Sequence, residues 1–324
     1  MVGLSRSPIA YRHVIFPETL AGPGLAIDRF TPPRSRSLPP GQDRHLSLSE
    51  QDCLRRLFRL AGLDLDDYRP ETIKRRIPAC LRAVRVEHTN EIGPVVQRHP
   101  QLLDVALSAL VIGVTSFFRD PATFTALNER VLPELLAHNA GPRVWSAGCS
   151  DGAELYSLAM VLAHRGALQR SSLLGTDCRV DAIVRAKEGC FDPAAVKNVP
   201  AEFLGRYLSF NGARWRVHPY LRTAAHWRSG NVLTTPAPGP WDLILCRNLA
   251  IYMQPAAVER LWGQLEQSLR PGGFVVLGKA ERPNGTRELV QIVPSIYRRD
   301  GGLNRHSGPA SAALDRPPRY VVPS

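Results

Sequence analysis

The segment that most constrains the fold of this chain is residues 142–160, PRVWSAGCSDGAELYSLAM. A short apolar run around Trp145 leads into a turn rich in glycine and serine, and the apolar residues after the turn recur at helical spacing. A strand, a glycine turn and a helix in direct succession build the nucleotide pocket of an open α/β sheet. Glycine lets the backbone approach a ligand closely. The segment therefore predicts a doubly wound α/β fold with a nucleoside site at Gly148.

The acid at the start of the predicted helix narrows the class of ligand. A helix N-terminus carries a partial positive charge that stabilises an anion. Because Glu154 already occupies this position, it would repel a phosphate, whereas a cationic or sugar-bearing nucleoside would be accepted. S-adenosylmethionine is a sulfonium nucleoside without phosphate, and we expect it as the cofactor.

The chain after residue 143 alternates between strand and helix patterns, which predicts a parallel sheet. Residues 203–228 interrupt the alternation with aromatic and arginine residues, and they predict a small antiparallel insertion. The other predicted strands are 173–175, 241–246, a strand after the sharp turn at 271–273, and a last edge strand within 292–299. We therefore expect one α/β domain over residues 137–300.

Residues 46–136 have helical spacing and predict a separate N-terminal domain. Ser49 and Asp52 resemble a capping signal for a first helix that ends at Gly62. A second helix starts after Pro70 and carries a basic run, and residues 102–110 and 121–136 predict further helices. The basic run consists of Lys74, Arg75, Arg76, Arg82 and Arg85. Residues 1–45 and 301–324 lack periodicity and are predicted to be a disordered extension and a flexible tail.

The bulk composition is that of an ordinary soluble globular protein, with 44% apolar and 22% charged residues. The most apolar stretch, residues 102–114, contains Asp104 and is too short to cross a bilayer, and the N-terminus lacks a clean apolar signal core. The six cysteines show no C-x-x-C pair and no metal-ligand spacing. We therefore expect reduced thiols, no metal, no membrane insertion and a cytoplasmic location. The net charge of +12 suggests an acidic partner surface or nucleic acid.

Two motifs carry residues with alternative interpretations. Asp177 closes the second predicted strand, where an acid in a nucleotide fold accepts hydrogen bonds from ribose hydroxyls; it could equally cap the next helix. In residues 115–121, TSFFRDP, two aromatic residues would anchor a loop that aims Arg119. The guanidinium could hold a carboxylate as a fork, or it could simply pair with Asp120 at the surface.

The strand WDLIL leads into the second group of candidates, CRNLAIY over residues 246–252. Polar groups at the carboxyl end of a central strand lie where a substrate reaches a cofactor. Cys246 is more consistent with a small buried thiol than with a nucleophile, because nothing places a histidine beside it. Asn231, in GNVLTTP, could contact the nucleoside or shape a turn.

Taken together, these motifs resemble the CheR-type chemotaxis receptor methyltransferases, from about Leu46 to Arg299. VTSFFRDP is similar to the arginine loop of that family, and WSAGCSDGAELYSLAM to its cofactor turn. LLGTD, GNVL, WDLILCRNLAIYM and LRPGGFVVLGKAE resemble its other signatures, in the same order.

The resemblance implies a class I S-adenosylmethionine-dependent methyltransferase, with a mostly parallel seven-stranded sheet, a helical N-terminal domain and a small β insertion. It implies methyl transfer to glutamate side chains of a chemotaxis-type receptor, whose acidic helical region would meet the basic run. The cofactor residues that it implies are Thr115, Arg119, Gly148, Glu154, Asp177, Asn231 and Asn248, with Arg119 and Tyr252 nearest the reacting groups.

Several positions depart from the family pattern. Gly113 stands where the family usually has Asn, Ala153 replaces one of two acids, Asp151 replaces a Thr, and Arg179 replaces an acid. A methyltransferase fold that has lost turnover and serves as a signalling scaffold is the alternative. A nucleic-acid methyltransferase, suggested by the charge, ranks last because the amino-methylating signature [ND]-P-P-[YF] is not found in the sequence.

Overall fold

The computed structural model describes residues 46–111, 113, 115–137 and 141–301. The predicted extension, residues 1–45, and the tail after Gly301 lie outside the described residues.

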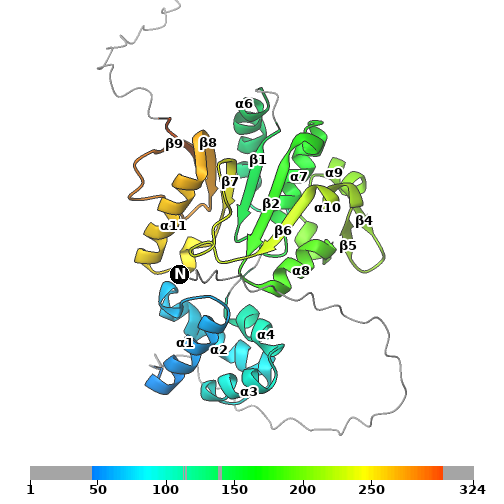
Figure 1. Ribbon diagram of the computed structural model, residues 1–324. Coiled ribbons are helices and arrows are strands. Elements are labelled where there is room, and N and C mark those ends of the chain that lie inside the picture. Colours follow the sequence, from blue (N-terminus) through cyan, green and yellow to red (C-terminus); the bar gives the residue numbers. More distant parts are fainter. Residues whose placement is uncertain (1–45, 112, 114, 138–140, 302–324) are drawn as a thin grey trace, which may run out of the picture. The chain divides into compact units, whose positions relative to one another are not determined.

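A seven-stranded sheet in the order β6-β2-β1-β7-β8-β10-β9 forms the centre of the fold (Figure 1). Its strands are β1 (Arg143–Ala147), β2 (Ser172–Asp177), β6 (Ala225–Ser229), β7 (Trp241–Cys246), β8 (Leu269–Leu277), β9 (Leu289–Val293) and β10 (Ile296–Arg299). Neighbouring strands from β6 to β8 are parallel, and only β10 and β9 join antiparallel to their neighbours. The predicted doubly wound, mostly parallel seven-stranded sheet is confirmed.

Apolar cores lie on both faces of this sheet. Helix α7 (Ala153–His164) packs on one face, in a core that includes Val144. Helix α11 (Pro255–Ser268) packs on the other face, with Trp145. Successive side chains of a strand point to opposite faces, so β1 contributes to both cores. Helix α8 (Val180–Glu188) follows β2 and contacts β2 and β6.

The N-terminal helices share a core of their own. They are α1 (Leu48–Leu60), α2 (Pro70–Val84), α3 (Ile92–Arg98) and α4 (Leu102–Leu110). The cap of α1 is Ser47 with Glu50, not Ser49 with Asp52: Ser47 Oγ accepts from the Glu50 N–H, and a Glu50 carboxylate oxygen accepts from the Ser47 N–H. The helix starts earlier than predicted because this reciprocal pair satisfies two backbone donors.

The segment after the arginine loop packs with the sheet. It consists of α5 (Pro121–Ala126), a π-helical segment η3 (Leu127–Val131) and α6 (Leu132–Ala137). Phe124, Leu132 and Leu135 belong to the same core as α7, whereas the core of the N-terminal helices ends at Val111. The helical pattern of 121–136 is confirmed, but its apolar face joins the α/β core, so the boundary between the two cores falls near residue 113 and not at 136.

A three-stranded antiparallel sheet forms the insertion, in the order β3-β5-β4. It contains β3 (Cys190–Phe191), β4 (Leu208–Phe210) and β5 (Trp215–Val217), with helices α9 (Ala201–Tyr207) and α10 (Pro219–Ala224). The insertion therefore begins before residue 203. Its predicted end differs as well, because β6 (225–229) pairs in parallel with β2 in the large sheet.

Two further sequence expectations are corrected at the other end of the sheet. Residues 271–273 lie inside β8, where Gly272 has a φ of 77° and the register with β7 shifts. The segment 292–299 contains the end of β9, a hairpin turn and β10, and β10 is an interior strand whereas β9 forms the edge. Among the described residues, short 3₁₀ helices lie at Leu65–Asp67, Thr89–Glu91, Leu168–Arg170, Pro193–Val196 and Ala250–Tyr252.

Candidate active site

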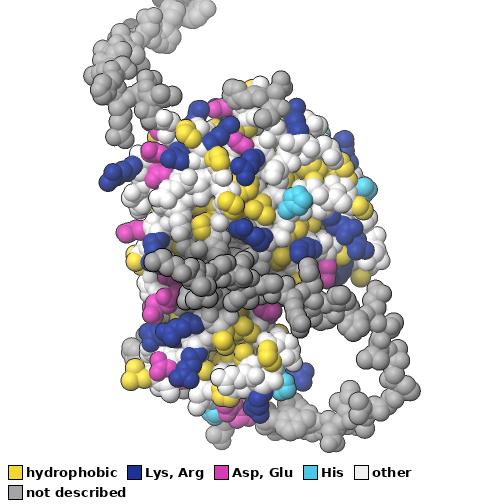
Figure 2. All heavy atoms as spheres, viewed as in Figure 1, with side chains coloured by type: hydrophobic (Ala, Val, Ile, Leu, Met, Phe, Trp, Pro, Cys, Tyr) yellow, Lys and Arg dark blue, Asp and Glu magenta, His cyan; other side chains and the backbone are white. Residues whose placement is uncertain are grey.

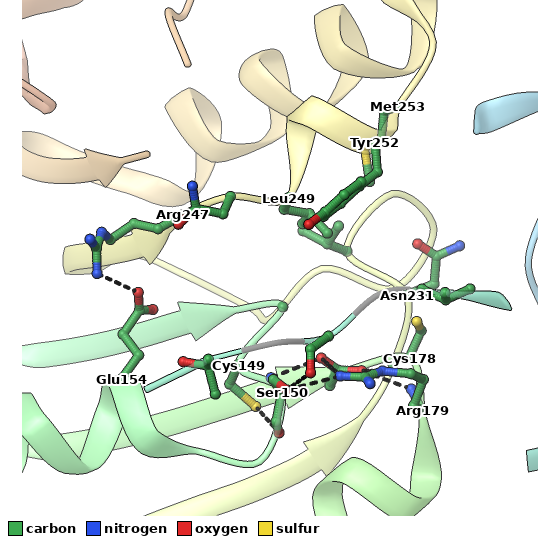
Figure 3. Close-up of a pocket in the computed structure, with 18 of the residues that line it drawn as sticks. Cys149, Ser150, Glu154, Cys178, Arg179, Asn231, Arg247, Leu249, Tyr252 and Met253 are labelled. Carbon is green, nitrogen blue, oxygen red and sulfur yellow. Dashed lines mark hydrogen bonds and ion pairs between the residues drawn. The ribbon is translucent and has the colours of Figure 1, made fainter. Parts of the chain in front are cut away.

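One cavity lies beyond the carboxyl ends of β1, β2 and β7, which is where ligands bind in open α/β sheets (Figure 3). The structure brings to this cavity all eight residues that the sequence nominated. They are Thr115, Arg119, Gly148, Glu154, Asp177, Asn231, Asn248 and Tyr252. Their individual roles stay predictions, but their convergence from distant parts of the chain defines the candidate site.

The turn after β1 is shaped by left-handed backbone at Gly148 and Gly152, with φ of 72° and 90°. The N–H groups of Gly148 and Cys149 donate to the Thr176 carbonyl at 2.8 and 2.9 Å, which fastens the turn to the end of β2. A Cβ at Gly152 would lie 2.5 Å from the ring of Trp227. Glycine is therefore required both for the backbone conformation and for the close approach of this ring.

Glu154, in the first turn of α7, is buried and paired. One carboxylate oxygen accepts from Ser146 Oγ at 2.9 Å, and the other lies 3.2 Å from Nη1 of Arg247. Nη2 of Arg247 also lies 2.7 Å from the Arg119 carbonyl and 2.8 Å from a carboxylate oxygen of Asp120. Glu154 is thus not the lone anion expected from the sequence, since the guanidinium compensates its charge and ties the loop after β7 to α7 and to the loop that carries Arg119.

Arg247 was not nominated from the sequence. Its position directly after the buried strand β7 was the signal that could have found it, because charged groups there face the site.

The loop that carries Arg119 is held by its two aromatic residues. Phe117 and Phe118 are buried, and the Phe117 ring lies 4.7 Å from that of Phe191. The Phe118 N–H donates to Ser157 Oγ at 2.9 Å, so the loop is joined to α7. The two residues before Arg119 are therefore anchored, and they fix the backbone that presents Arg119 to the cavity.

Asp120 pairs with two cations, Arg247 and Lys279, the latter at 2.9 Å. Burial alone would raise the pKa of Asp120, but the Lys279 ammonium and the Arg247 guanidinium outweigh it, and the pKa is lowered. The carboxylate is therefore charged in the folded protein at neutral pH.

The loop after β7 presents Asn248 in a left-handed conformation, with a φ of 59°. The buried carboxylate of Glu281 fixes this loop by accepting from the N–H groups of Asn248, Ala250 and Gly278 at 2.7–2.9 Å. Oδ1 of Asn248 is buried with no hydrogen-bond partner among the described residues. Since buried polar atoms nearly always have a partner, this oxygen is suited to a donor group of a ligand. Glu281 was missed because LGKAE gives no local sign of its contacts.

Arg179 lies at the opposite end of the cavity from Glu154 (Figure 3), and it forms a buried ion pair with Asp177. Oδ1 of Asp177 accepts from the backbone N–H and from Nε of Arg179, each at 3.0 Å. Oδ2 accepts from the Ser150 N–H at 2.9 Å. Asp177 thus shapes the turn into α8, whose N-cap residue is Arg179.

The remaining nominated residues lie along the cavity wall. Asn231 Oδ1 accepts from the Leu233 N–H at 3.0 Å, which is the turn chemistry that the sequence allowed. Tyr252 is held by its carbonyl, which accepts from the Arg69 N–H at 2.9 Å. Nε of Arg69 donates to the Met253 carbonyl at 2.9 Å, so the N-terminal helices close one side of the site.

The cysteines near the site are thiols with no sign of activation. Cys149 and Cys246 are buried, and burial raises the pKa of each. Burial also raises the pKa of Cys178 to about 12. A thiol in this range is not a thiolate at neutral pH, which supports the interpretation of Cys246 as a structural residue. Among the described residues, no cluster of His, Cys, Asp or Glu has the geometry to hold a metal ion.

A second cleft, of about 490 Å³, shares Thr115 and Arg119 with the cavity. Three further basic residues line it, namely Arg185, Lys197 and Arg214. They outnumber the acids there, Asp151 and Asp192. Arg119 therefore stands between the cavity at the sheet edge and a basic cleft that suits an acidic ligand.

The residues of the cavity fit an adenosyl cofactor. Carboxylates lie at both ends, Asp177 toward β2 and Glu154 toward α7. The unpartnered oxygen of Asn248 supplies an acceptor between them. The fold and the site together define an S-adenosylmethionine-dependent methyltransferase.

Residues 113–298 match the family described as CheR methyltransferase, SAM binding domain. This match covers more than half of the chain, and the protein belongs to that family. It is therefore an enzyme of the methyltransferase class whose cofactor is S-adenosylmethionine.

Relatives support this assignment. The chain is 33% identical over 226 residues to chemotaxis protein methyltransferase 1 of Pseudomonas aeruginosa, covering 64% of this chain and 82% of that one. It is 29% identical over 250 residues to chemotaxis protein methyltransferase Cher2 of Pseudomonas putida, covering 73% and 91%. A 104.1 kDa protein of Rhodobacter capsulatus is 32% identical over 233 residues, 70% of this chain but only 24% of that protein. The chain thus spans about a quarter of that larger relative.

Among the helices that the structure describes, none combines the length and the apolar character needed to cross a bilayer.

Proposed function

We propose that the protein transfers the methyl group of S-adenosylmethionine to glutamate side-chain carboxylates of a chemotaxis-type receptor or a related signalling protein. The observation that carries this proposal is the position of Arg119, which lines both the cavity and the basic cleft. The names of the relatives, chemotaxis protein methyltransferases, favour the same class of substrate.

A carboxylate acceptor makes modest chemical demands on the protein. When bound, the cofactor supplies an electrophilic methyl carbon whose bond to sulfur breaks as a carboxylate oxygen forms the ester, with no proton transferred. The main task of the chain is alignment, which can contribute up to about 7–11 kcal/mol to catalysis. Arg119 orients the acceptor carboxylate from the cleft side, and Tyr252 lines its path.

The other nominated residues hold the cofactor. Asp177 accepts the ribose hydroxyls, and Asn231 and Thr115 line the same recess. Glu154 faces the positively charged end, and Asn248 offers its unpartnered oxygen to an amino group. Gly148 allows the turn after β1 to lie against the nucleoside.

The acidic helical region of the receptor would bind the basic run on α2. Arg75, Arg82 and Arg85 are exposed there, whereas Nε of Arg76 donates to the Ala109 carbonyl and secures α4. A surface of this kind favours an acidic protein partner. Such a substrate would place the enzyme in the cytoplasm, on the inner side of the membrane.

Nucleic acid is a less suitable substrate. On the face shown in Figure 2, Lys and Arg side chains are interspersed with Asp and Glu and do not merge into one stripe. A nucleic-acid groove usually gathers basic residues along one path.

The test is a methyl-transfer assay with the full chain, a tritium-labelled methyl donor and cytoplasmic fragments of chemotaxis receptors. We expect label in the receptor that alkali releases as methanol, because glutamate methyl esters are base-labile. Arg119→Ala should reduce this signal at least about tenfold, the effect of losing one charged hydrogen bond. Label that survives alkali would contradict the carboxylate acceptor.

The scaffold alternative is favoured by one observation, the ion pair of Arg179 with Asp177, which engages the proposed ribose ligand. A scaffold without turnover would bind no S-adenosylhomocysteine, whether or not Arg179 is present.

A further inference from the structure

Arg179 fills the part of the cavity that faces Asp177. Its Nε lies 3.0 Å from Oδ1 of Asp177, and its Nη2 lies 3.4 Å from Oδ2. With the N–H groups of Ser150 and of Arg179 itself, each oxygen of Asp177 already accepts two hydrogen bonds. A carboxylate offers about four acceptor sites. A ribose hydroxyl would therefore find none vacant while the guanidinium keeps this position.

The guanidinium also lies against the backbone at Gly113. A Cβ at Gly113 would lie 1.9 Å from Nη2 and 2.2 Å from Cζ of Arg179, far inside van der Waals contact. Ser150 Oγ accepts from Nη2 at 3.1 Å and donates to the Gly113 carbonyl at 3.0 Å. The two departures from the family pattern are therefore neighbours in space, because glycine at 113 makes the room that Arg179 occupies.

The cavity with Arg179 inside is too small for a nucleoside. Its volume is about 70 Å³, against about 490 Å³ for the adjoining cleft. Sites for small molecules usually enclose about 300–1,000 Å³. Arg179 stands at the N-cap of α8, so its long side chain can rotate out of the cavity with no change in the helix.

We propose that Arg179 occupies the ribose subsite and sets the affinity for the cofactor by competing with the ribose hydroxyls for Asp177. This inference rests on the proposed function, because it takes Asp177 as the residue that holds the ribose. Cofactor binding then exchanges an internal ion pair for hydrogen bonds to the ligand. A cavity without the guanidinium should therefore bind the same nucleoside more tightly.

The test is calorimetric titration of S-adenosylhomocysteine into the wild-type chain and into Arg179→Ala. Loss of the competing charged hydrogen bonds should lower the Kd at least about tenfold. A residue that served only the fold, or that oriented Asp177 for the ligand, would raise the Kd when removed. An analogue without ribose hydroxyls should also bind Arg179→Ala more tightly than the wild type, because it too has to displace the guanidinium to enter the cavity.

Gly113→Ala provides an independent variant that keeps the arginine, and it decides the question if Arg179→Ala does not fold. Its Cβ would displace the guanidinium, so the Kd should fall as well. Arg270→Ala is the matched control, since Arg270 pairs with Asp242 at 2.6 Å outside the cavity, and its Kd should equal that of the wild type.

The outcomes separate this inference from the proposed function. A wild-type chain that binds the ligand, with an equal or weaker Arg179→Ala variant, would overturn the role of Arg179 and leave the proposed function intact. A folded wild type and folded variants that all fail to bind would overturn both.

Discussion

Two buried arginines line the cavity at its two ends, and each is paired with a carboxylate. Arg247 contacts Glu154, Asp120 and the carbonyl of Arg119, so it joins its own loop to α7 and to the loop that carries Arg119. The side chain of Arg179 hydrogen-bonds to Asp177, at the end of the strand that precedes it, and to Ser150 in the turn after β1, and it lies against Gly113 inside the cavity. A buried arginine–carboxylate pair can therefore serve as a structural link at one end of the cavity, whereas at the other end it competes with the ligand. What differs is whether the guanidinium connects separate elements or fills space that a ligand needs.

The largest expected effect is on stability, and it separates the two arginines. Arg247→Ala leaves Glu154 and Asp120 without their shared cation, and breaking a buried pair costs about 3–5 kcal/mol. Arg179→Ala should cost less, because Asp177 keeps two backbone N–H donors. Urea denaturation of both variants measures the free energies of unfolding. Equal losses would contradict the distinction drawn between the two ends.

The next largest expected effect is on cofactor affinity, and it distinguishes Asp177 from Glu154. Asp177→Asn should raise the Kd for S-adenosylhomocysteine about tenfold to a hundredfold, because it weakens hydrogen bonds from the ribose to a charged acceptor. Glu154→Gln should have a smaller effect, since Arg247 already compensates the charge of Glu154. Calorimetry on the two variants decides the order, and a greater loss for Glu154→Gln would reverse the assignment of the two ends.

The smallest expected effect is on the pH dependence of stability, through Asp120, which pairs with Arg247. The pKa of Asp120 is lowered in the folded state, so its contribution to stability is present above the unfolded pKa of about 3.9. It is lost as the pH falls from there through the lower folded pKa. Asp120 should contribute only about 1 kcal/mol to stability, because its side chain is 20% exposed and solvent screens its charge.

Denaturation of Asp120→Asn at neutral and acid pH measures this contribution. Stability of the variant should fall less steeply in acid than that of the wild type. Lys279→Met should give an intermediate slope, since it removes one of the two cations near Asp120. Identical slopes in all three proteins would show that the pair contributes nothing.

The sequence was sufficient for the fold class and for the place of the candidate site. The strand, glycine turn and helix at 142–160 and the polar residues after 177 and 246 are local signals, and local signals identify the edge of the sheet that binds ligands. Strand partners were harder to predict: β6 looked like part of the insertion because its pairing with β2 is a long-range contact.

The contacts inside the site could not be predicted in the same way. Arg247 meets Asp120 across 127 positions of sequence, and Glu281 meets Asn248 across 33. Gly113 and Arg179 were visible only as two separate departures from the family pattern. Their complementarity depends on the distance between a missing Cβ and a guanidinium, which only the folded chain reveals.

The most direct test of this account is a crystal structure of the chain with S-adenosylhomocysteine. We predict that the ribose hydroxyls lie within hydrogen-bond distance of Asp177, that the Arg179 guanidinium has left the cavity, and that the Arg247–Glu154 pair is unchanged. A complex in which Arg179 still pairs with Asp177 while the ribose is held by other residues would contradict it.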